Sequence, residues 1–260
     1  MKDVQNLIDE RGIAIQKVGV SEVHLPFLIK TKAGGLQSVL ANIKLVVDLP
    51  KEYKGTHMSR FIDILNEWRQ KPISEKEMAL ILSDIIERLS AQRAHMEFSF
   101  KYFIEKEAPV SGMKSLLDYD CQFFGNLVRG EELDFTLAVA VPFTSVCPCS
   151  KEISLYGAHN QRGLMRVKLK HRPVNFIWIE DLVTKMEAQG SAPLYSLLKR
   201  EDEKYLTEKA YENPKFVEDV LRDLVLMLRG LNGVTWFEVE CENYESIHNH
   251  SAYAAHTEAL

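Results

Sequence analysis

The sequence predicts an α+β fold in which an antiparallel sheet carries helices on one face. Three observations predict it: period-two alternation of apolar and polar residues, helical apolar stripes between the alternating segments, and an order of strand, strand, helix, helix, strand, strand that occurs twice. No Gly/Ser/Pro-rich linker separates the two halves, 20–129 and 130–260. We therefore expect residues 1–260 to form one bimodular subunit rather than two independently moving domains.

The first half supplies six elements. Residues 21–31 and 37–49 alternate on either side of the Gly34-Gly35 turn, which predicts a strand pair. Residues 58–68 place apolar side chains on one helical face, and Ser74-x-x-Glu77 is a capping box that opens a second helix. The two returning strands are expected at 95–106 and 113–129.

The second half repeats this order without residue-level identity. The expected strands are 132–144, 163–171 and 235–242, with helices at 177–188 and 214–231 between them and the last return strand left undefined. The repeat is physically reasonable, because an antiparallel sheet with one apolar face needs helices that cover that face.

Composition narrows the classes of protein that the chain can belong to. Lys+Arg 32 against Asp+Glu 37 gives a net charge of −5, which disfavours nucleic acid as the main partner. Apolar runs stay far below the roughly 20 residues that cross a bilayer. The opening MKDVQNLIDE lacks the pattern of a secretory signal. We expect a cytoplasmic protein with no membrane partner, whose four cysteines are reduced.

The most informative segment is 142–151, PFTSVCPCSK, followed by His159. A buried strand ends here, and Cys147 and Cys149 flank Pro148 where the chain opens into a loop. Both thiols could be small buried hydrophobes. A thiol pair with a histidine nearby is, however, typical of metal binding or thiol chemistry, and Cys-x-Cys differs from the Cys-x2-Cys knuckle of closed structural zinc sites.

Further candidate ligands lie towards the C-terminus. His248 and His250 alternate in ESIHNH, so they share one side of an extended segment. Alone they would be a solvated tail; with Cys147 and His159 they could complete an open site in which water fills one position. The segment 199–204 offers three carboxylates, although a charged helix surface explains it equally well.

Glu218 lies in the first turn of a helix that opens at Asn213-Pro214. It suits the helix dipole, and it could also anchor a ligand, because two carboxylate oxygens match two adjacent N–H donors such as those on the edge of guanine.

Residues 51–60, KEYKGTHMSR, hold Lys51, Lys54 and Arg60 against the single acid Glu52 and lead into a helix start. Cationic side chains beside the free amides of a helix N-terminus are suited to binding phosphate, so this segment could be a phosphate site. The alternative is a basic loop that is simply exposed to solvent.

Four motifs in order resemble the type IB GTP cyclohydrolases, the prokaryotic enzymes that start folate synthesis. They are PKEYKGTHMSRF (50–61), VPFTSVCPCSKEIS (141–154), YGAHNQRG (156–163) and ESIHNHSAYA (245–254). The resemblance covers nearly the whole chain. It implies hydrolysis of GTP to 7,8-dihydroneopterin triphosphate and formate, a tandem T-fold subunit (ββααββ twice), and a homotetramer with active sites at subunit interfaces.

The resemblance also implies residue roles. One divalent metal, Zn, Mn or Fe²⁺, would be held by Cys147, His159, Glu201 and His248. Glu218 would anchor the purine, and Cys149 and His250 would transfer protons or orient ligands beside the catalytic Cys147 and His159. The triphosphate would be bound by Lys51, Lys54, His57 and Arg60.

Two rival functions remain open on the sequence. One is the nitrile reductase of queuosine synthesis, in which a cysteine nucleophile attacks the substrate and no metal is needed. The other is a non-catalytic metal-binding or scaffolding protein of the same fold.

Overall fold

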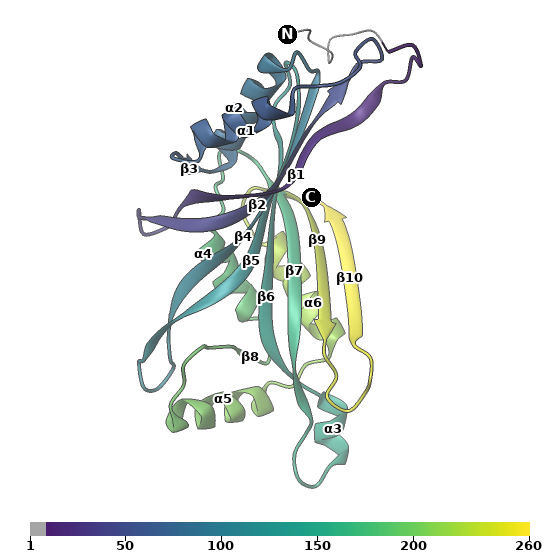
Figure 1. Ribbon diagram of the computed structural model, residues 1–260. Coiled ribbons are helices and arrows are strands. Elements are labelled where there is room, and N and C mark those ends of the chain that lie inside the picture. The colour runs from purple at the N-terminus through teal and green to yellow at the C-terminus, as the bar shows by residue number, and fades with distance from the viewer. Residues whose placement is uncertain (1–8) are drawn as a thin grey trace. The chain divides into compact units, whose positions relative to one another are not determined.

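The structure is a computed structural model that describes residues 9–260 (Figure 1). The opening segment read for a secretory signal therefore lies mostly outside the described residues. Over the described residues the first half contains β1 (Ile15–Lys30), β2 (Leu36–Leu49), α1 (Met58–Trp68), β3 (Pro72–Ile73), α2 (Glu75–Arg88), β4 (Arg93–Glu107) and β5 (Lys114–Val128). The second half contains β6 (Asp134–Val146), α3 (Pro148–Ile153), β7 (Asn160–His171), α4 (Ile179–Glu187), β8 (Ala192–Pro193), α5 (Arg200–Glu212), α6 (Val217–Arg229), β9 (Val234–Asn243) and β10 (Ala252–Ala259).

The predicted architecture is wrong in its element order and in its sheet. The strands of residues 9–260 form a ten-stranded sheet with the order β10-β9-β7-β6-β5-β4-β2-β1-β3, and β8 pairs with β6. The sheet is mixed, because β3 pairs with β1 in parallel. The short strands β3 and β8 and the helices α3 and α5 interrupt the expected ββααββ repeat, so a purely antiparallel sheet built from two such modules does not describe this chain.

Two compact units make up the described chain, one of residues 9–101 and 121–137 and the other of residues 102–120 and 138–260. In the first unit, α1 and α2 lie side by side and bury the apolar faces that the periodicity predicted. α2 packs so closely on β5 that a Cβ atom at Gly125 would lie 2.6 Å from Met78 Sδ. Ser74 is the N-cap of α2 as expected, but its hydroxyl bonds the Glu77 carboxylate instead of a backbone amide.

The second unit carries the motifs whose side chains could bind a metal or take part in catalysis. α6 lies along β9 and β10 and buries Val220, Leu224 and Leu228. The strand β9 pairs antiparallel with both β7 and β10, so its Asn243 lies opposite Gly163 on one side and Ala252 on the other. This packing brings the end of β6, the start of β7 and the start of α6 together. The candidate site lies at that junction.

Candidate functional site

Cys147 and His159 lie on adjacent backbone segments. Cys147 follows the last residue of β6 and is the N-cap of α3, where its Sγ accepts a hydrogen bond from the Ser150 amide at 3.4 Å. The Cys147 amide donates to the His159 carbonyl at 3.1 Å, and the His159 amide donates to Ser150 Oγ at 3.1 Å. Pro148 occupies the first helical turn, where its missing N–H costs nothing. The two residues that the sequence grouped are therefore held together by backbone bonds.

The His159 ring is oriented by two side chains that the sequence analysis did not name. Nδ1 lies 2.9 Å from Gln161 Oε1 and 3.8 Å from Glu245 Oε2, and Gln161 Nε2 lies 3.5 Å from Glu245 Oε1. With the amide oriented so that Oε1 faces the ring, these acceptors favour a proton on Nδ1 and leave the lone pair on Nε2. A second partner of this kind is typical of histidines that ligate metals through the other nitrogen.

A sequence signal for both partners exists. Gln161 lies near the start of β7, two residues after His159, and alternate residues of an extended segment share a face. Glu245 is the first residue of the motif ESIHNH. What the sequence does not show is that these residues, 84 positions apart, meet.

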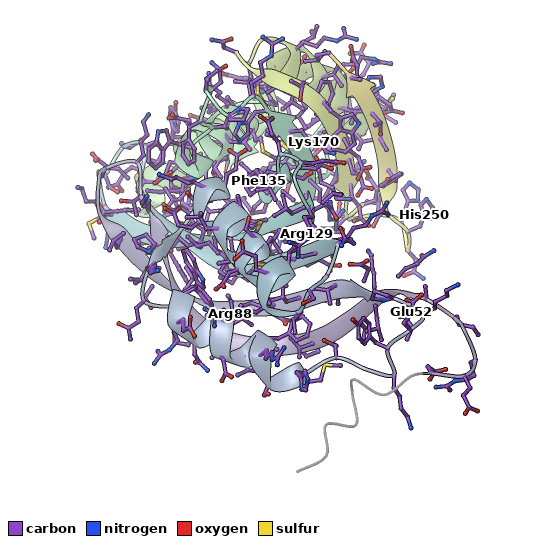
Figure 2. All side chains as sticks on the ribbon, turned by 90° about the horizontal axis from the view of Figure 1, so that it is seen from above. Glu52, Arg88, Arg129, Phe135, Lys170 and His250 are labelled. Atoms are coloured by element: carbon purple, nitrogen blue, oxygen red, sulfur yellow. The ribbon has the colours of Figure 1, made fainter. Side chains whose placement is uncertain are left out.

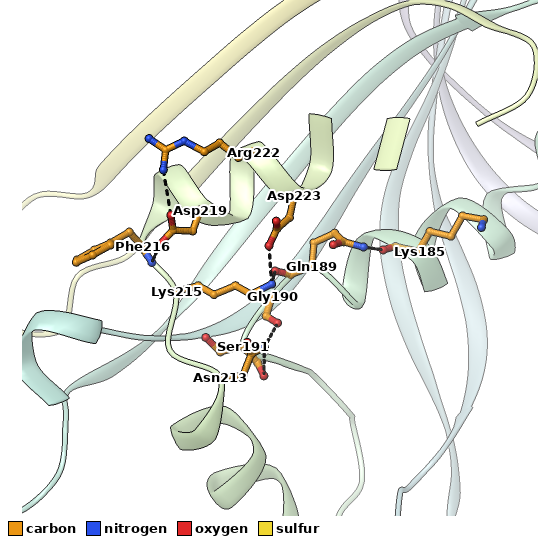
Figure 3. Close-up of polar contacts among 10 residues, drawn as sticks. All are labelled: Lys185, Gln189, Gly190, Ser191, Asn213, Lys215, Phe216, Asp219, Arg222 and Asp223. Carbon is orange, nitrogen blue, oxygen red and sulfur yellow. Dashed lines mark hydrogen bonds and ion pairs between the residues drawn. The ribbon is translucent and has the colours of Figure 1, made fainter. Parts of the chain in front are cut away.

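The start of α6 is tied to the end of β6. The Lys215 amide donates to the Val146 carbonyl at 3.1 Å, one residue before Cys147. Asp219, rather than Glu218, bonds the N-cap amide of Phe216 at 3.1 Å and so closes the first turn (Figure 3). Glu218 is exposed and makes no side-chain hydrogen bond within residues 9–260. Its carboxylate is therefore available to a ligand.

The three acids at the start of α5 have different environments. Asp202 is fully buried, and its carboxylate accepts hydrogen bonds from the amides of Val110, Ser111 and Lys199. Glu201 is exposed. Glu203 lines a cavity of about 450 Å³ whose walls include Val146 and Ala158, the residues before Cys147 and His159.

Helical periodicity explains that difference. Glu203, Leu206, Thr207 and Ala210 share one face of α5, and this face packs towards the cavity, whereas Glu201 falls on the opposite face. The carboxylate of Asp202 is thus already used in hydrogen bonds that hold the fold. Glu203 is a carboxylate beside the cavity that the sequence pattern did not single out.

His248 and His250 lie on the loop between β9 and β10, where His250 is labelled in Figure 2. Both side chains are exposed, and their rings stack with centroids 5.1 Å apart and planes 17° apart. Over residues 9–260 no group of three or more His, Cys, Asp or Glu side chains is placed to hold a metal ion. The single chain thus brings Cys147 and His159 together but does not gather Glu201 or His248 around them.

The basic loop lies in the first unit. Lys51 and Lys54 are exposed, and His57 is the N-cap residue of α1 without a side-chain capping bond. Arg60 donates to the Arg88 carbonyl at 2.9 Å, so part of its hydrogen-bonding capacity is used within the unit.

Comparisons with known proteins match nearly the whole chain. The family model described as type I GTP cyclohydrolase folE2 matches residues 1–254. The GTP cyclohydrolase FolE2 of Geotalea uraniireducens is 55% identical over 255 residues, 98% of this chain and 92% of that protein. That of Geobacter metallireducens is 54% identical over 255 residues, 98% of this chain and 96% of that protein.

Solved structures show the fold. A uricase from Bacillus fastidious superposes with a TM-score of 0.60 at 9% identity, covering 94% of each chain. The uricase from Arthrobacter globiformis gives a TM-score of 0.53 at 7% identity, covering 94% of this chain and 93% of the other. The predicted tandem T-fold of two ββααββ modules is therefore corrected to a uricase-like fold with a ten-stranded mixed sheet.

Among residues 9–260, none of the helices has the length and apolar character needed to span a membrane.

Proposed function

Because this chain belongs to the family of type I GTP cyclohydrolases folE2, we infer that it is a GTP cyclohydrolase. It hydrolyses GTP to 7,8-dihydroneopterin triphosphate and formate, the first step of folate biosynthesis. The observation that carries this conclusion is 52–55% identity over 98% of the chain to several GTP cyclohydrolases FolE2. Cys147 and His159, which lie on adjacent backbone segments, supply a thiol and an imidazole that suit a metal-dependent hydrolysis.

We propose that Cys147 Sγ and His159 Nε2 hold one divalent metal. The fit rests on the Cys147–His159 backbone bond and on the Gln161–Glu245 pair, which orients the ring as a metal-ligating histidine requires. A mixed sulfur, nitrogen and oxygen donor set favours no single ion, so Zn, Mn and Fe²⁺ all suit it. Such a metal, when bound, supplies a hydroxide near neutral pH for attack on a purine carbon.

The chain's own residues bind and orient the substrate. In this proposal the Glu218 carboxylate accepts two N–H bonds from the guanine edge, and Cys149 and His250 hold or deliver protons beside the ligands. Lys51, Lys54, His57 and Arg60 bind the triphosphate. The protein works in the cytoplasm.

The remaining metal ligands in the proposal are Glu201 and His248. Within residues 9–260 the single chain does not gather them around Cys147 and His159. We propose that a second copy of the chain contributes them, in a homotetramer with active sites at subunit interfaces. Glu203 is the alternative carboxylate, because it lines the cavity beside Ala158 within one subunit.

Metal analysis and a GTP assay on the same purified sample test the proposal. We expect one divalent metal per subunit, formate release and pterin fluorescence, all lost on chelation. The absence of turnover with Zn, Mn and Fe²⁺ would refute the activity. Comparing Glu201→Gln with Glu203→Gln then identifies the carboxylate ligand, since only the ligand variant loses metal.

A further inference from the structure

Lys215 makes four hydrogen bonds at the junction between β6 and α6. Its amide donates to the Val146 carbonyl at 3.1 Å, and its carbonyl accepts from Ser145 Oγ at 3.3 Å. Its Nζ donates to the Gln189 carbonyl at 2.9 Å and to Asp223 Oδ2 at 2.8 Å (Figure 3). The side chain is only 17% exposed, so its charge is largely removed from water and paired with Asp223.

The segment 189–198, which we call the strap, connects α4 to α5 and contains β8. Four of its residues line the 450 Å³ cavity: Pro193, Leu194, Tyr195 and Leu198. Side chains from outside the strap bind its carbonyl groups. Lys215 binds that of Gln189, and Asn213 Nδ2 binds those of Gly190 and Ser191 at 3.1 and 3.3 Å (Figure 3).

These bonds close a ring around Val146, the residue before Cys147. The Val146 carbonyl accepts from the Lys215 amide, while the Val146 amide donates to Ser191 Oγ at 3.2 Å. Lys215 Nζ completes the ring by reaching Gln189, two residues before Ser191. Ser145 is held from the other side by Asn243 Nδ2 at 3.0 Å. The end of β6, the strap and the start of α6 are thus fixed to one another through Lys215.

We propose that Lys215 is a positioning residue for the GTP site. It fixes Glu218, which lies three residues further along the chain in the first turn of α6, relative to Cys147, which directly follows Val146. The inference rests on the proposed function, in which Glu218 binds the guanine and Cys147 holds the metal. Lys215 contacts neither group, and it acts by setting the distance between purine anchor and metal ligand.

The chemistry of lysine suits this role. An ammonium on a flexible stem can donate at once to a carbonyl on the strap and to a carboxylate on α6. Methionine has similar length and no donor, so Lys215→Met removes both bonds with little change in volume. Lys215→Arg retains the charge and the donors. The exposed Lys185 on α4 provides the matched control, Lys185→Met.

The test compares these variants of the full chain by hydrogen exchange and by steady-state kinetics with GTP. For Lys215→Met we expect faster amide exchange in 189–198 and 213–219 only, and an unchanged metal content. We also expect kcat/KM to fall by about tenfold or more through a higher KM, because displacements near 1 Å cost up to 10²-fold. Lys215→Arg should recover most of the loss, and Lys185→Met should match the parent protein.

Two results would overturn the inference. One is unchanged exchange in both segments of Lys215→Met. The other is exchange that rises throughout the protein while KM stays constant, which marks a purely structural role. If the parent protein itself fails to turn over GTP, the proposed function fails, and the exchange measurement still decides whether Lys215 holds the strap to α6.

Discussion

The amide of Cys147 donates to the carbonyl of His159 at 3.1 Å, so a thiol and an imidazole that are twelve positions apart in the chain lie on neighbouring backbone segments. This contact between the two segments is made by the backbone and involves neither side chain.

Replacing Cys147 with alanine should therefore remove metal without unfolding the site. Loss of the soft ligand is expected to weaken metal affinity by more than about 100-fold, the upper effect of removing a residue that only orients a ligand. Metal content after purification and dialysis measures this. Cys149→Ala is the matched control, which should lose turnover but keep the metal. Full occupancy in Cys147→Ala would show that Cys147 is not a ligand.

Glu218→Ala should weaken GTP binding and leave the metal content unchanged. Loss of hydrogen bonds to a charged group costs about 1.5–3 kcal/mol, which corresponds to roughly 10- to 100-fold in affinity. Fluorescence titration with GTP, in parallel with metal analysis, checks both parts. Glu212→Ala, an exposed residue at the end of α5, is the control. A Glu218 variant that purifies without metal would contradict its role as an anchor.

Lys106→Met should destabilise the second unit. Lys106 Nζ lies 2.6 Å from Glu187 Oε1, and Tyr119 donates to the same oxygen at 2.8 Å. Burial lowers the pKa of Lys106 in spite of the neighbouring carboxylate. Removing the ammonium leaves Glu187, whose side chain is 12% exposed, without its cation, which costs about 3–5 kcal/mol.

Urea unfolding of the single and double variants measures that cost. In Lys106→Met/Glu187→Met the unpaired carboxylate is gone as well, so the double variant should be more stable than the sum of the two single losses predicts. Strict additivity would show that the pair is not coupled.

Asp202 should make stability depend on acid pH. Burial alone would raise the pKa of its carboxyl group, but hydrogen bonds from Ser111, Lys199 and Val110 outweigh burial and lower the pKa far below its usual range. Because the folded pKa lies below the unfolded one, the stabilisation is complete above about pH 4 and is lost as pH falls towards the folded pKa. The urea midpoint of Asp202→Asn should fall less between pH 6 and pH 3 than that of the parent protein. Parallel pH profiles would refute this.

Gly163→Ala should destabilise the protein by overpacking. An added Cβ would lie 2.5 Å from the Phe143 ring and 2.7 Å from Asn243 Oδ1. Relieving such contacts typically costs about 1–3 kcal/mol. Thermal unfolding measures the loss. In Gly230→Ala the nearest contact is 3.4 Å and φ is −80°, so that variant should remain close to the parent protein.

The sequence predicts best those elements whose pattern is local. α1 matches its expected bounds of 58–68, because Phe61, Ile64 and Leu65 form one buried face that periodicity reveals. By contrast, α5 buries only Asp202 and Ala210, so it carries no apolar stripe, and the charged segment remained open to two interpretations. The two-residue strands β3 and β8 exist only through pairing with β1 and β6, which no local pattern encodes.

The same reasoning separates the parts of the candidate site. Cys147 and His159 could be grouped from the sequence because both lie close to the point where a buried strand ends and the chain opens into a loop. The Gln161–Glu245 pair and the Lys215 ring join residues tens of positions apart, and only folding brings them together. The choice between Glu201 and Glu203 depends on which face of α5 packs against Val146 and Ala158, and a helix without an apolar stripe does not reveal that face in its sequence.

The four cysteines fall into two classes of accessibility. Cys121 and Cys241 are buried, and burial raises the pKa of the Cys241 thiol to about 12, whereas Cys147 is half-buried and Cys149 is exposed. Because thiolates rather than thiols are alkylated, iodoacetamide will label the native protein at Cys149 first. The fraction of molecules alkylated at Cys241, measured by mass spectrometry, will instead report the fraction whose core has unfolded. The chain therefore carries its own chemical reporter of unfolding.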